Sequence, residues 1–229
     1  MEDKIWYLKQ INILKCLTDK ELMTLGSQCS MIRYKRGDKV YLPQTTPNIY
    51  FIKSGGLKLV SVTSDGTEIV KDVIAEGEIF GKFFGVDMNE QEQVIALEDC
   101  MICYLPFSDW QFFIKDNPAL NLSFIKWIGL RIKRIERKMD SLYFKTSRQR
   151  IVETLIEMGK RLGKRDSSNN IIVKLDLKHD ELAQLTGSSR QFVNTFLNEL
   201  RQKKLIDYTR STFILKESFM NDENGSFSN

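Results

Sequence analysis

Six polar side chains recur between residues 189 and 198, with types and spacing that suit hydrogen bonding to nucleic-acid bases: Ser189, Arg190, Gln191, Asn194, Thr195 and Asn198. A guanidinium can bond guanine through two hydrogen bonds, and the amide of Gln or Asn can bond adenine in the same way. Helical spacing separates these residues from an apolar set that we expect to face the core: Phe192, Val193, Phe196, Leu197 and Leu200. The alternative is an ordinary polar surface helix.

The segment His179–Leu200 consists of two short helical patterns on either side of Gly187. Glycine ends a helix readily because it adopts a positive φ without a steric penalty. Ser188 or Ser189 can then cap the second helix, since a serine oxygen accepts from the free N–H groups there. Two helices joined by so tight a turn predict a helix-turn-helix, whose second helix enters the DNA major groove.

The residues around this unit favour a winged form of it. Leu205–Tyr208 and Thr212–Leu215 have strand character and bracket a short turn, as a β-hairpin does. We expect base contacts from four side chains of the second helix: Arg190, Gln191, Asn194 and Thr195. We expect phosphate contacts, which position a protein without specifying a sequence, from Ser189, Lys178, His179 and Arg210.

Residues 31–106 have a different character, because short β-branched and aromatic segments alternate there with turn signals. The predicted strands are Lys39–Leu42, Asn48–Lys53, Leu57–Thr63, Thr67–Val73 and Met101–Leu105. Their regular spacing predicts an antiparallel barrel or roll. Asp65-Gly66 predicts a hairpin with a type I′ turn, in which both central residues have positive φ. Residues 1–30 look helical, and Thr18 with Glu21 matches a capping box.

A long helix is expected after the pair Asn117-Pro118, which supplies a cap and a first-turn proline. Six apolar positions along it are spaced alternately by three and four residues: Ile125, Ile128, Ile132, Ile135, Met139 and Leu142. That spacing is a heptad seam and predicts a dimerisation helix. The alternative is a core helix that packs on its own domain.

A chain of 229 residues suggests two small domains. We predict an α+β protein with an N-terminal antiparallel β-roll (1–116), a dimerisation helix (117–144), a C-terminal winged helix-turn-helix (145–219) and a disordered tail (220–229). Residues 1–116 hold 13 Lys and Arg against 17 Asp and Glu, whereas residues 145–229 hold 15 against 11. A basic C-terminal part beside an acidic N-terminal part fits DNA binding at one end.

Other classes of function have little support in the sequence. Cys100 and Cys103 are three residues apart, so on a strand their sulfurs point to opposite faces and chelate one metal poorly. We therefore expect reduced structural thiols and no metal. A single histidine and the lack of a glycine-rich phosphate loop leave no catalytic set, so we expect no enzyme. The charged N-terminus and the lack of a long apolar run predict a cytoplasmic protein.

Several motifs occur in the order that a known family has them: Gly37-Asp38, Gly55, Asp65-Gly66, Gly77-Glu78-x-Phe80-Gly81, Ala96-Leu97-Glu98-Asp99 and Leu182-Ala183-x-x-x-Gly187-x-Ser189-Arg190. Over essentially its whole length the chain resembles the Crp/Fnr family of bacterial transcription regulators. The resemblance implies a cupin-like, cyclic-nucleotide-binding-like roll. It also implies a homodimer that binds an inverted repeat in double-stranded promoter DNA, with RNA polymerase as a partner.

The chain departs from the family where effectors bind. The resemblance implies a possible effector pocket at Phe80, Gly81, Lys82, Glu90 and Gln91. Members that bind cyclic AMP have a Glu where this chain has Lys82, and an Arg near Glu90 or Gln91. A carboxylate or amide cannot neutralise a phosphate as a guanidinium does, so we predict no cyclic AMP binding. The effector is then unknown, or none is needed.

Cofactor-binding members of the family are also a poor match. Cys103 resembles one ligand of an iron–sulfur cluster, but only Cys16 and Cys29 precede the roll, and a close-set N-terminal run of cysteines is missing. His179 lies at the DNA-binding end and is a poor haem ligand, so we expect no cofactor. In the recognition helix, Gln191 and Thr195 replace a Glu and an Arg that are common in the family. The rival hypothesis is a small-molecule-binding module that acts through protein partners.

Overall fold

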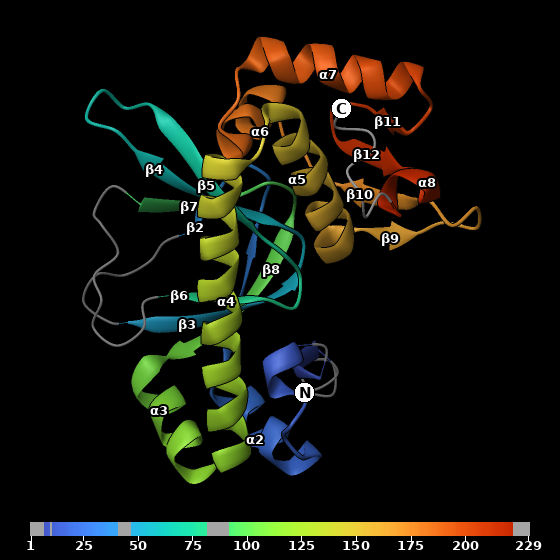
Figure 1. Cartoon of the computed structure of the whole chain (residues 1–229). Coiled ribbons are helices and arrows are strands. Elements are labelled where there is room, and N and C mark those ends of the chain that lie inside the picture. The colour runs from blue at the N-terminus through green and yellow to red at the C-terminus, as the bar shows by residue number, and fades with distance from the viewer. Residues whose placement is uncertain (1–6, 10, 41–46, 82–91, 222–229) are drawn as a thin grey trace. The chain divides into compact units, whose positions relative to one another are not determined.

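The computed structural model describes residues 7–9, 11–40, 47–81 and 92–221 (Figure 1). The chain forms two compact units. One comprises Met1–Gly66 and Val73–Ile135, and the other comprises Thr67–Asp72 and Glu136–Asn229. The first unit is built around antiparallel sheets, and the second is mainly helical.

Two antiparallel sheets form a roll, which belongs to the first unit except for Thr67–Asp72. Their strands are β1 (Ser30–Tyr34), β2 (Lys39–Val40), β3 (Asn48–Ser54), β4 (Leu57–Val62), β5 (Glu68–Ile74), β6 (Ile79–Gly81), β7 (Glu92–Ala96) and β8 (Cys100–Pro106). One sheet has the order β1-β8-β3-β6 and the other has the order β2-β7-β4-β5. The predicted antiparallel β-roll and the α+β class are confirmed.

Strand β3 is buried on both faces, because one face meets helices and the other meets the second sheet. Ile49 and Phe51 belong to a core that includes Leu25 and Trp110 from flanking helices. Tyr50 and Ile52 alternate with them and belong to a core between the two sheets. A continuous apolar run is therefore the pattern that this central strand requires.

The same alternation separates the two cysteines of β8. Cys103 lies in the core beneath the helices, whereas Cys100 lies in the core between the sheets. The prediction that their sulfurs point to opposite faces is confirmed. Burial, and then the negative charge of Glu98, raises the pKa of the Cys100 thiol to about 11. This thiol is therefore protonated and unreactive at neutral pH.

We expect one of the four thiols to react rapidly with a thiol reagent in the folded protein at pH 8. Cys16 is exposed, whereas Cys29, Cys100 and Cys103 are buried. Ellman's reagent would measure this as one fast equivalent, followed by three more on unfolding in guanidinium. A Cys16→Ser variant should lose the fast phase. A fast phase that survives this substitution would show that one of the buried thiols is accessible.

Helices cover the outer face of the roll. They are η1 (Asn12–Leu14), α2 (Asp19–Gln28), α3 (Phe107–Asp116) and α4 (Pro118–Phe144). The predicted capping box of α2 is present, since Thr18 Oγ1 accepts from Glu21 N and the Glu21 carboxylate accepts from Thr18 N. Asn117 Oδ1 accepts from Leu120 N at 2.9 Å, as the predicted cap of α4 requires.

The apolar seam of α4 divides into a packed part and an exposed part. Ile128 is half-buried against the core of its own unit, beside Phe124. The remaining seam residues are between 49% and 58% exposed in the single chain: Ile125, Ile132, Ile135, Met139 and Leu142. An apolar row of this length on one helix is typical of an interaction surface.

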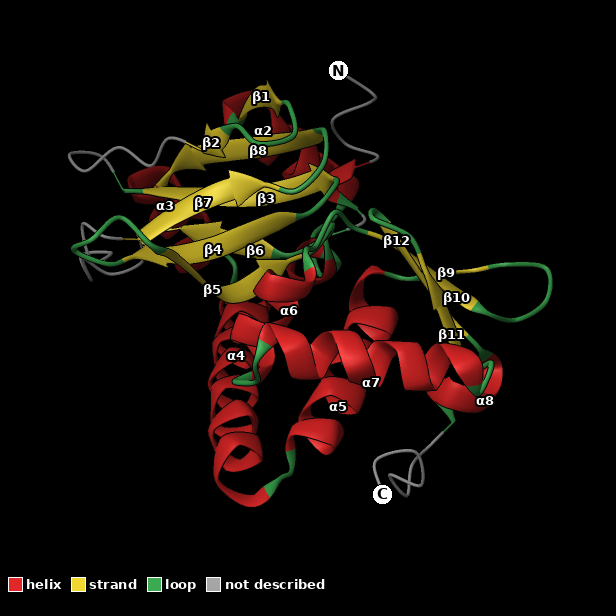
Figure 2. Cartoon of the chain, turned by 90° about the horizontal axis from the view of Figure 1, so that it is seen from above, coloured by secondary structure: helices red, strands yellow, loops and turns green. Residues whose placement is uncertain are grey.

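The second unit contains helices and a small sheet. The helices are α5 (Ser147–Leu162), α6 (His179–Thr186), α7 (Arg190–Gln202) and α8 (Glu217–Met220), and the strands are β9 (Lys164–Arg165), β10 (Ile171–Lys174), β11 (Ile206–Tyr208) and β12 (Thr212–Leu215). The strand order is β11-β12-β10-β9. Figure 2 shows this sheet beside the carboxyl end of α7. The predicted wing is the hairpin β11–β12.

Several local expectations were wrong. Strands β1, β6, β7 and β9 were not predicted, because each is short and owes its hydrogen bonds to a partner strand elsewhere in the chain. The turn after β4 is not type I′. Gly66 has φ +83°, but Asp65 is not among the positive-φ residues, and Gly66 N donates to Thr63 O at 2.9 Å. Met220, predicted as the first residue of the tail, is instead the last residue of α8, and residues 222–229 lie outside the described residues.

Candidate nucleic-acid interface

The two-helix unit has the predicted local geometry. Helix α6 ends at Gly187, which adopts the left-handed conformation with φ +59° and ψ +38°. Ser189 caps α7, because its Oγ accepts from Phe192 N at 3.2 Å. Ser188 N donates to Ala183 O at 2.9 Å, and this hydrogen bond closes the turn between the two helices. These contacts fix the direction in which α7 leaves the turn.

Helix α7 is anchored by its apolar face and by one charged pair. Val193, Phe196, Leu197 and Leu200 are buried, but Phe192 is 37% exposed, so its predicted place in the apolar face is wrong. Both oxygens of Glu199 accept from the Arg148 guanidinium, at 2.6 and 3.2 Å. The same guanidinium lies over the Phe196 ring, 4.8 Å from its centroid. The bidentate geometry holds α7 against α5.

Arg150 of α5 forms hydrogen bonds with backbone carbonyls just before α5 and at the end of α6. Its guanidinium donates to Thr186 O at 2.6 Å, to Gly187 O at 2.8 Å and to Lys145 O at 2.8 Å. The first two acceptors are carbonyls at the end of α6, which have no helical partner. Arg150 therefore stabilises the turn that precedes the predicted recognition helix.

The four predicted base-contacting residues share one face of α7, but they differ in exposure and in the hydrogen bonds that they already form within the protein. Arg190, Gln191 and Thr195 are exposed, and Asn194 is half-buried. The Thr195 hydroxyl donates to Gln191 O at 3.1 Å. Its donor is thus used within the helix, and its methyl group is the part suited to contact with a thymine methyl.

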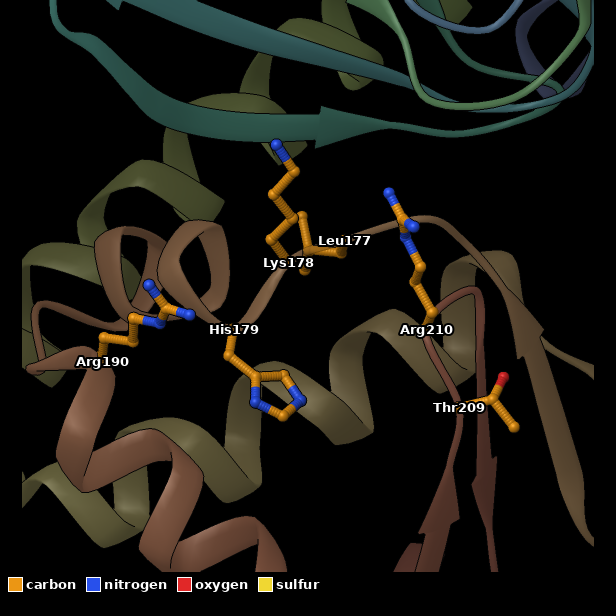
Figure 3. Close-up of a pocket in the computed structure, with 6 residues that line it drawn as sticks. All are labelled: Leu177, Lys178, His179, Arg190, Thr209 and Arg210. Carbon is orange, nitrogen blue, oxygen red and sulfur yellow. The ribbon is translucent and has the colours of Figure 1, made fainter.

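Three of the four predicted phosphate-contacting residues line a pocket of the second unit. It is lined by Leu177, Lys178, His179, Arg190, Thr209 and Arg210, which come from the start of α6, the start of α7 and the tip of the wing (Figure 3). The side chains of Lys178 and Arg210 extend in the same direction, whereas the His179 ring points away from them. Ser189 lies next to Arg190 but serves as the cap of α7.

Charge in the pocket is mostly positive. The Lys178 and Arg190 side chains are exposed. The Arg210 side chain is 82% exposed and forms a loose ion pair with Asp176, at 4.0 Å. Exposed cations at two helix starts and a hairpin tip are suited to phosphate oxygens, because helix N-termini also favour anions.

One residue of this surface, Tyr208, was not singled out from the sequence as a contact residue. Tyr208 of β11 donates from its hydroxyl to Asn198 Oδ1 at 2.9 Å. Its ring meets the His179 imidazole edge-on, with centroids 5.2 Å apart. No local pattern links a wing strand to a recognition helix, so only the fold brings these residues together.

The residues of the predicted effector pocket are only partly described. Phe80 is buried in the core between the sheets and stacks on Tyr50, with ring centroids 4.8 Å apart. Gly81 ends β6 and pairs with Ile49. Lys82, Glu90 and Gln91 lie outside the described residues. The pocket therefore stays a prediction.

Across residues 7–9, 11–40, 47–81 and 92–221, no three side chains of the His, Cys, Asp or Glu type converge as metal ligands would. Within the same ranges no helix has the length and apolar character to cross a membrane.

Comparison with known proteins identifies both units. Residues 31–117 match the family described as cyclic nucleotide-binding domain, and residues 149–218 match the Crp-like helix-turn-helix domain. Together these matches cover more than half of the chain.

Individual relatives agree with this assignment. A global nitrogen regulator from Nostoc sp. is 25% identical over 177 residues, which are 76% of this chain and 79% of that protein. The anaerobic regulatory protein of Bacillus subtilis is 25% identical over 169 residues, or 73% of this chain and 71% of that protein. The fold matches FixK2 from Bradyrhizobium japonicum with a TM-score of 0.69 at 16% identity, over 84% of this chain and 96% of FixK2. With a cyclic-nucleotide-binding-like roll joined to a winged helix-turn-helix, this chain belongs to the Crp/Fnr family of transcription regulators.

Proposed function

We propose that this chain acts in the cytoplasm as a homodimer that binds an inverted repeat in promoter DNA and regulates transcription there. The observation that carries the proposal is the surface at the start of α7. Arg190, Gln191 and Thr195 are exposed on one helical face there, beside the cations Lys178 and Arg210. The three side chains of α7 can distinguish bases, and the two cations can bind the phosphate backbone beside them.

The exposed seam of α4 supports the dimer. Five apolar side chains at heptad positions would be covered by the same helix of a second copy. A two-fold axis along that seam would present two recognition helices to successive major grooves, about 34 Å apart. An inverted repeat with half-sites one turn apart is the DNA that such a dimer matches.

Signal transfer from the roll to α4 can run through one contact within the first unit. Glu78, at the turn before β6, forms an ion pair with Arg134 of α4 at 3.3 Å, and each side chain is about one quarter exposed. A change in the roll at this turn would act on α4 and hence on the dimer. We extend the proposal to RNA polymerase as the partner at the promoter.

The proposal is tested by selecting duplexes from a random DNA pool with the purified full chain, without added ligand, at about physiological salt. We expect enrichment of a palindromic site, which would also show that no effector is required. Enrichment only after adding small molecules from a cell extract would indicate a ligand in the roll. Enrichment in neither case would refute the proposal and favour a module that acts through protein partners.

Arg190→Ala is expected to weaken binding to the selected site by about 1–3 kcal/mol and to relax the preference at one base pair. The reason is that a guanidinium contact to guanine carries sequence information. Fluorescence anisotropy on the selected duplex and on single-base variants would measure both effects.

Lys178→Ala is the matched control. Loss of a phosphate contact should weaken binding to all sequences equally and lower the salt dependence of binding by about one unit of slope. If Arg190→Ala also weakens every duplex to the same degree, then Arg190 contacts phosphate and does not specify a base.

We further propose that the regulator does not respond to cyclic AMP. This rests on the chemistry of Lys82, Glu90 and Gln91, since none of the three offers the guanidinium that family members use for the cyclic phosphate. Calorimetric titration of the full chain with cyclic AMP is expected to give no binding heat. Binding at micromolar concentration would contradict the proposal.

A further inference from the structure

The chain's only histidine is hydrogen-bonded to a side chain of the recognition helix. His179 Nδ1, at the start of α6, contacts Asn194 Oδ1, fifteen residues along the chain. The ring is half-buried and meets Tyr208 of the wing edge-on, at an interplanar angle of 69°. It points away from the Lys178 and Arg210 side chains (Figure 3). His179 is thus held between α6, α7 and β11.

The Asn194 side chain turns its oxygen toward His179 Nδ1, and this orientation determines which group donates. An amide oxygen carries no hydrogen, so the imidazole must carry its proton on Nδ1 and donate it to Asn194 Oδ1. One of the two lone pairs of the Asn194 oxygen is then engaged inside the protein, and this bond holds the amide in one orientation. The group that Asn194 keeps for a partner outside is its NH₂, which can only donate.

We propose that His179 is a positioning residue that sets the base preference of Asn194, which rests on the function proposed above. A free Asn side chain bonds adenine with both its oxygen and its nitrogen. With its oxygen bonded to His179 and the amide held by that bond, Asn194 contacts a base through its NH₂. It then suits a base edge that presents acceptors in the major groove, which are guanine N7 and O6 or thymine O4. This replaces the adenine preference that Asn at this position would otherwise have.

A pair of substitutions with equal shape tests the proposal. Leucine and asparagine both branch at Cγ, but the amide nitrogen of asparagine stands where His179 Nδ1 stands and can donate. We expect His179→Leu to free Asn194 and to shift the preference at one base pair toward adenine, by about fivefold or more. His179→Asn should keep the preference for guanine or thymine. Each variant is used as the full chain in the random-duplex selection.

The affected position is identified with Asn194→Ala, which should lose its preference at that base pair alone. In the Asn194→Ala background, His179→Leu should change no base preference further, because His179 acts through Asn194. A histidine that only stabilises the fold would instead lower affinity on all duplexes and lower the melting temperature.

Two results would overturn the proposal while leaving the regulator function intact. One is a wild-type preference for adenine at the position that depends on Asn194. The other is a His179→Leu variant that binds and selects the wild-type base. If the wild-type protein enriches no duplex, the proposed function fails and this inference fails with it.

A measurement on the wild-type protein keeps the test independent of how the variants fold. Because the untagged chain has one histidine, a long-range ¹H–¹⁵N NMR spectrum at pH 8 reports its tautomer directly. We expect the proton on Nδ1. A spectrum of the Nε2–H tautomer would refute the proposal, because Asn194 would then have to donate to His179 and present its oxygen to DNA.

Discussion

Replacing Ile132 with glutamate is expected to convert the proposed dimer into a monomer and to reduce affinity for the full inverted repeat by about 10²- to 10⁴-fold. Ile132 is 52% exposed in the single chain, so a charge there does not disturb the folded monomer. In a dimer the two-fold axis would bring two carboxylates into an apolar seam, where burying an unpaired charge is costly. The loss in affinity follows because a monomer has one recognition helix, and linking two binding modules raises affinity by that factor.

Leu130→Glu is the matched control, because Leu130 is 64% exposed on the same helix but lies outside the seam. Sedimentation velocity would give the oligomeric state, and anisotropy on full-site and half-site duplexes would give the affinities. We expect the Leu130 variant to remain dimeric. If Ile132→Glu also remains dimeric, or if both variants dissociate, the heptad seam is not the interface.

Phe196→Ala is expected to destabilise the second unit by about 3–5 kcal/mol and to abolish specific DNA binding at 37 °C. Truncating a buried phenylalanine removes its transfer free energy and leaves a cavity. Phe196 is 2% exposed, and the Arg148 guanidinium that holds Glu199 lies over its ring. The substitution therefore also loosens the bidentate pair that anchors α7.

The control is Phe192→Ala, one turn earlier on the same helix. Because Phe192 is 37% exposed and Phe196 is 2% exposed, truncation of Phe192 should cost clearly less than truncation of Phe196. Guanidinium denaturation followed by circular dichroism would measure the free energy of unfolding of each variant. Equal losses in the two variants would mean that α7 is packed differently from the arrangement described above.

Features that depend on neighbouring residues were predicted well from the sequence. The caps at Thr18, Asn117 and Ser189 form as expected, and so does the turn at Gly187, because a cap or turn is satisfied by atoms within four residues. The alternation along β8 also placed Cys100 and Cys103 on opposite faces correctly, since strand periodicity is a local property.

Features that depend on residues far apart in the chain were not predicted from the sequence. Strand β1 has little strand character of its own, yet each of its residues pairs with β8, some seventy residues along the chain. Helical periodicity cannot show that Phe192 lies at the edge of the apolar face, because exposure depends on what packs opposite.

The candidate interface likewise has one part that the sequence predicts and one part that only the packing of the helices and the wing determines. The residue types and spacing along α7 were enough to indicate a base-contacting surface, because one helix presents them all. That Asn194 has its oxygen engaged by His179, and Asn198 its oxygen engaged by Tyr208, follows only from the packing of α6, α7 and the wing. A hydrogen bond between side chains on different elements depends on their three-dimensional arrangement, and no local pattern in the sequence encodes it.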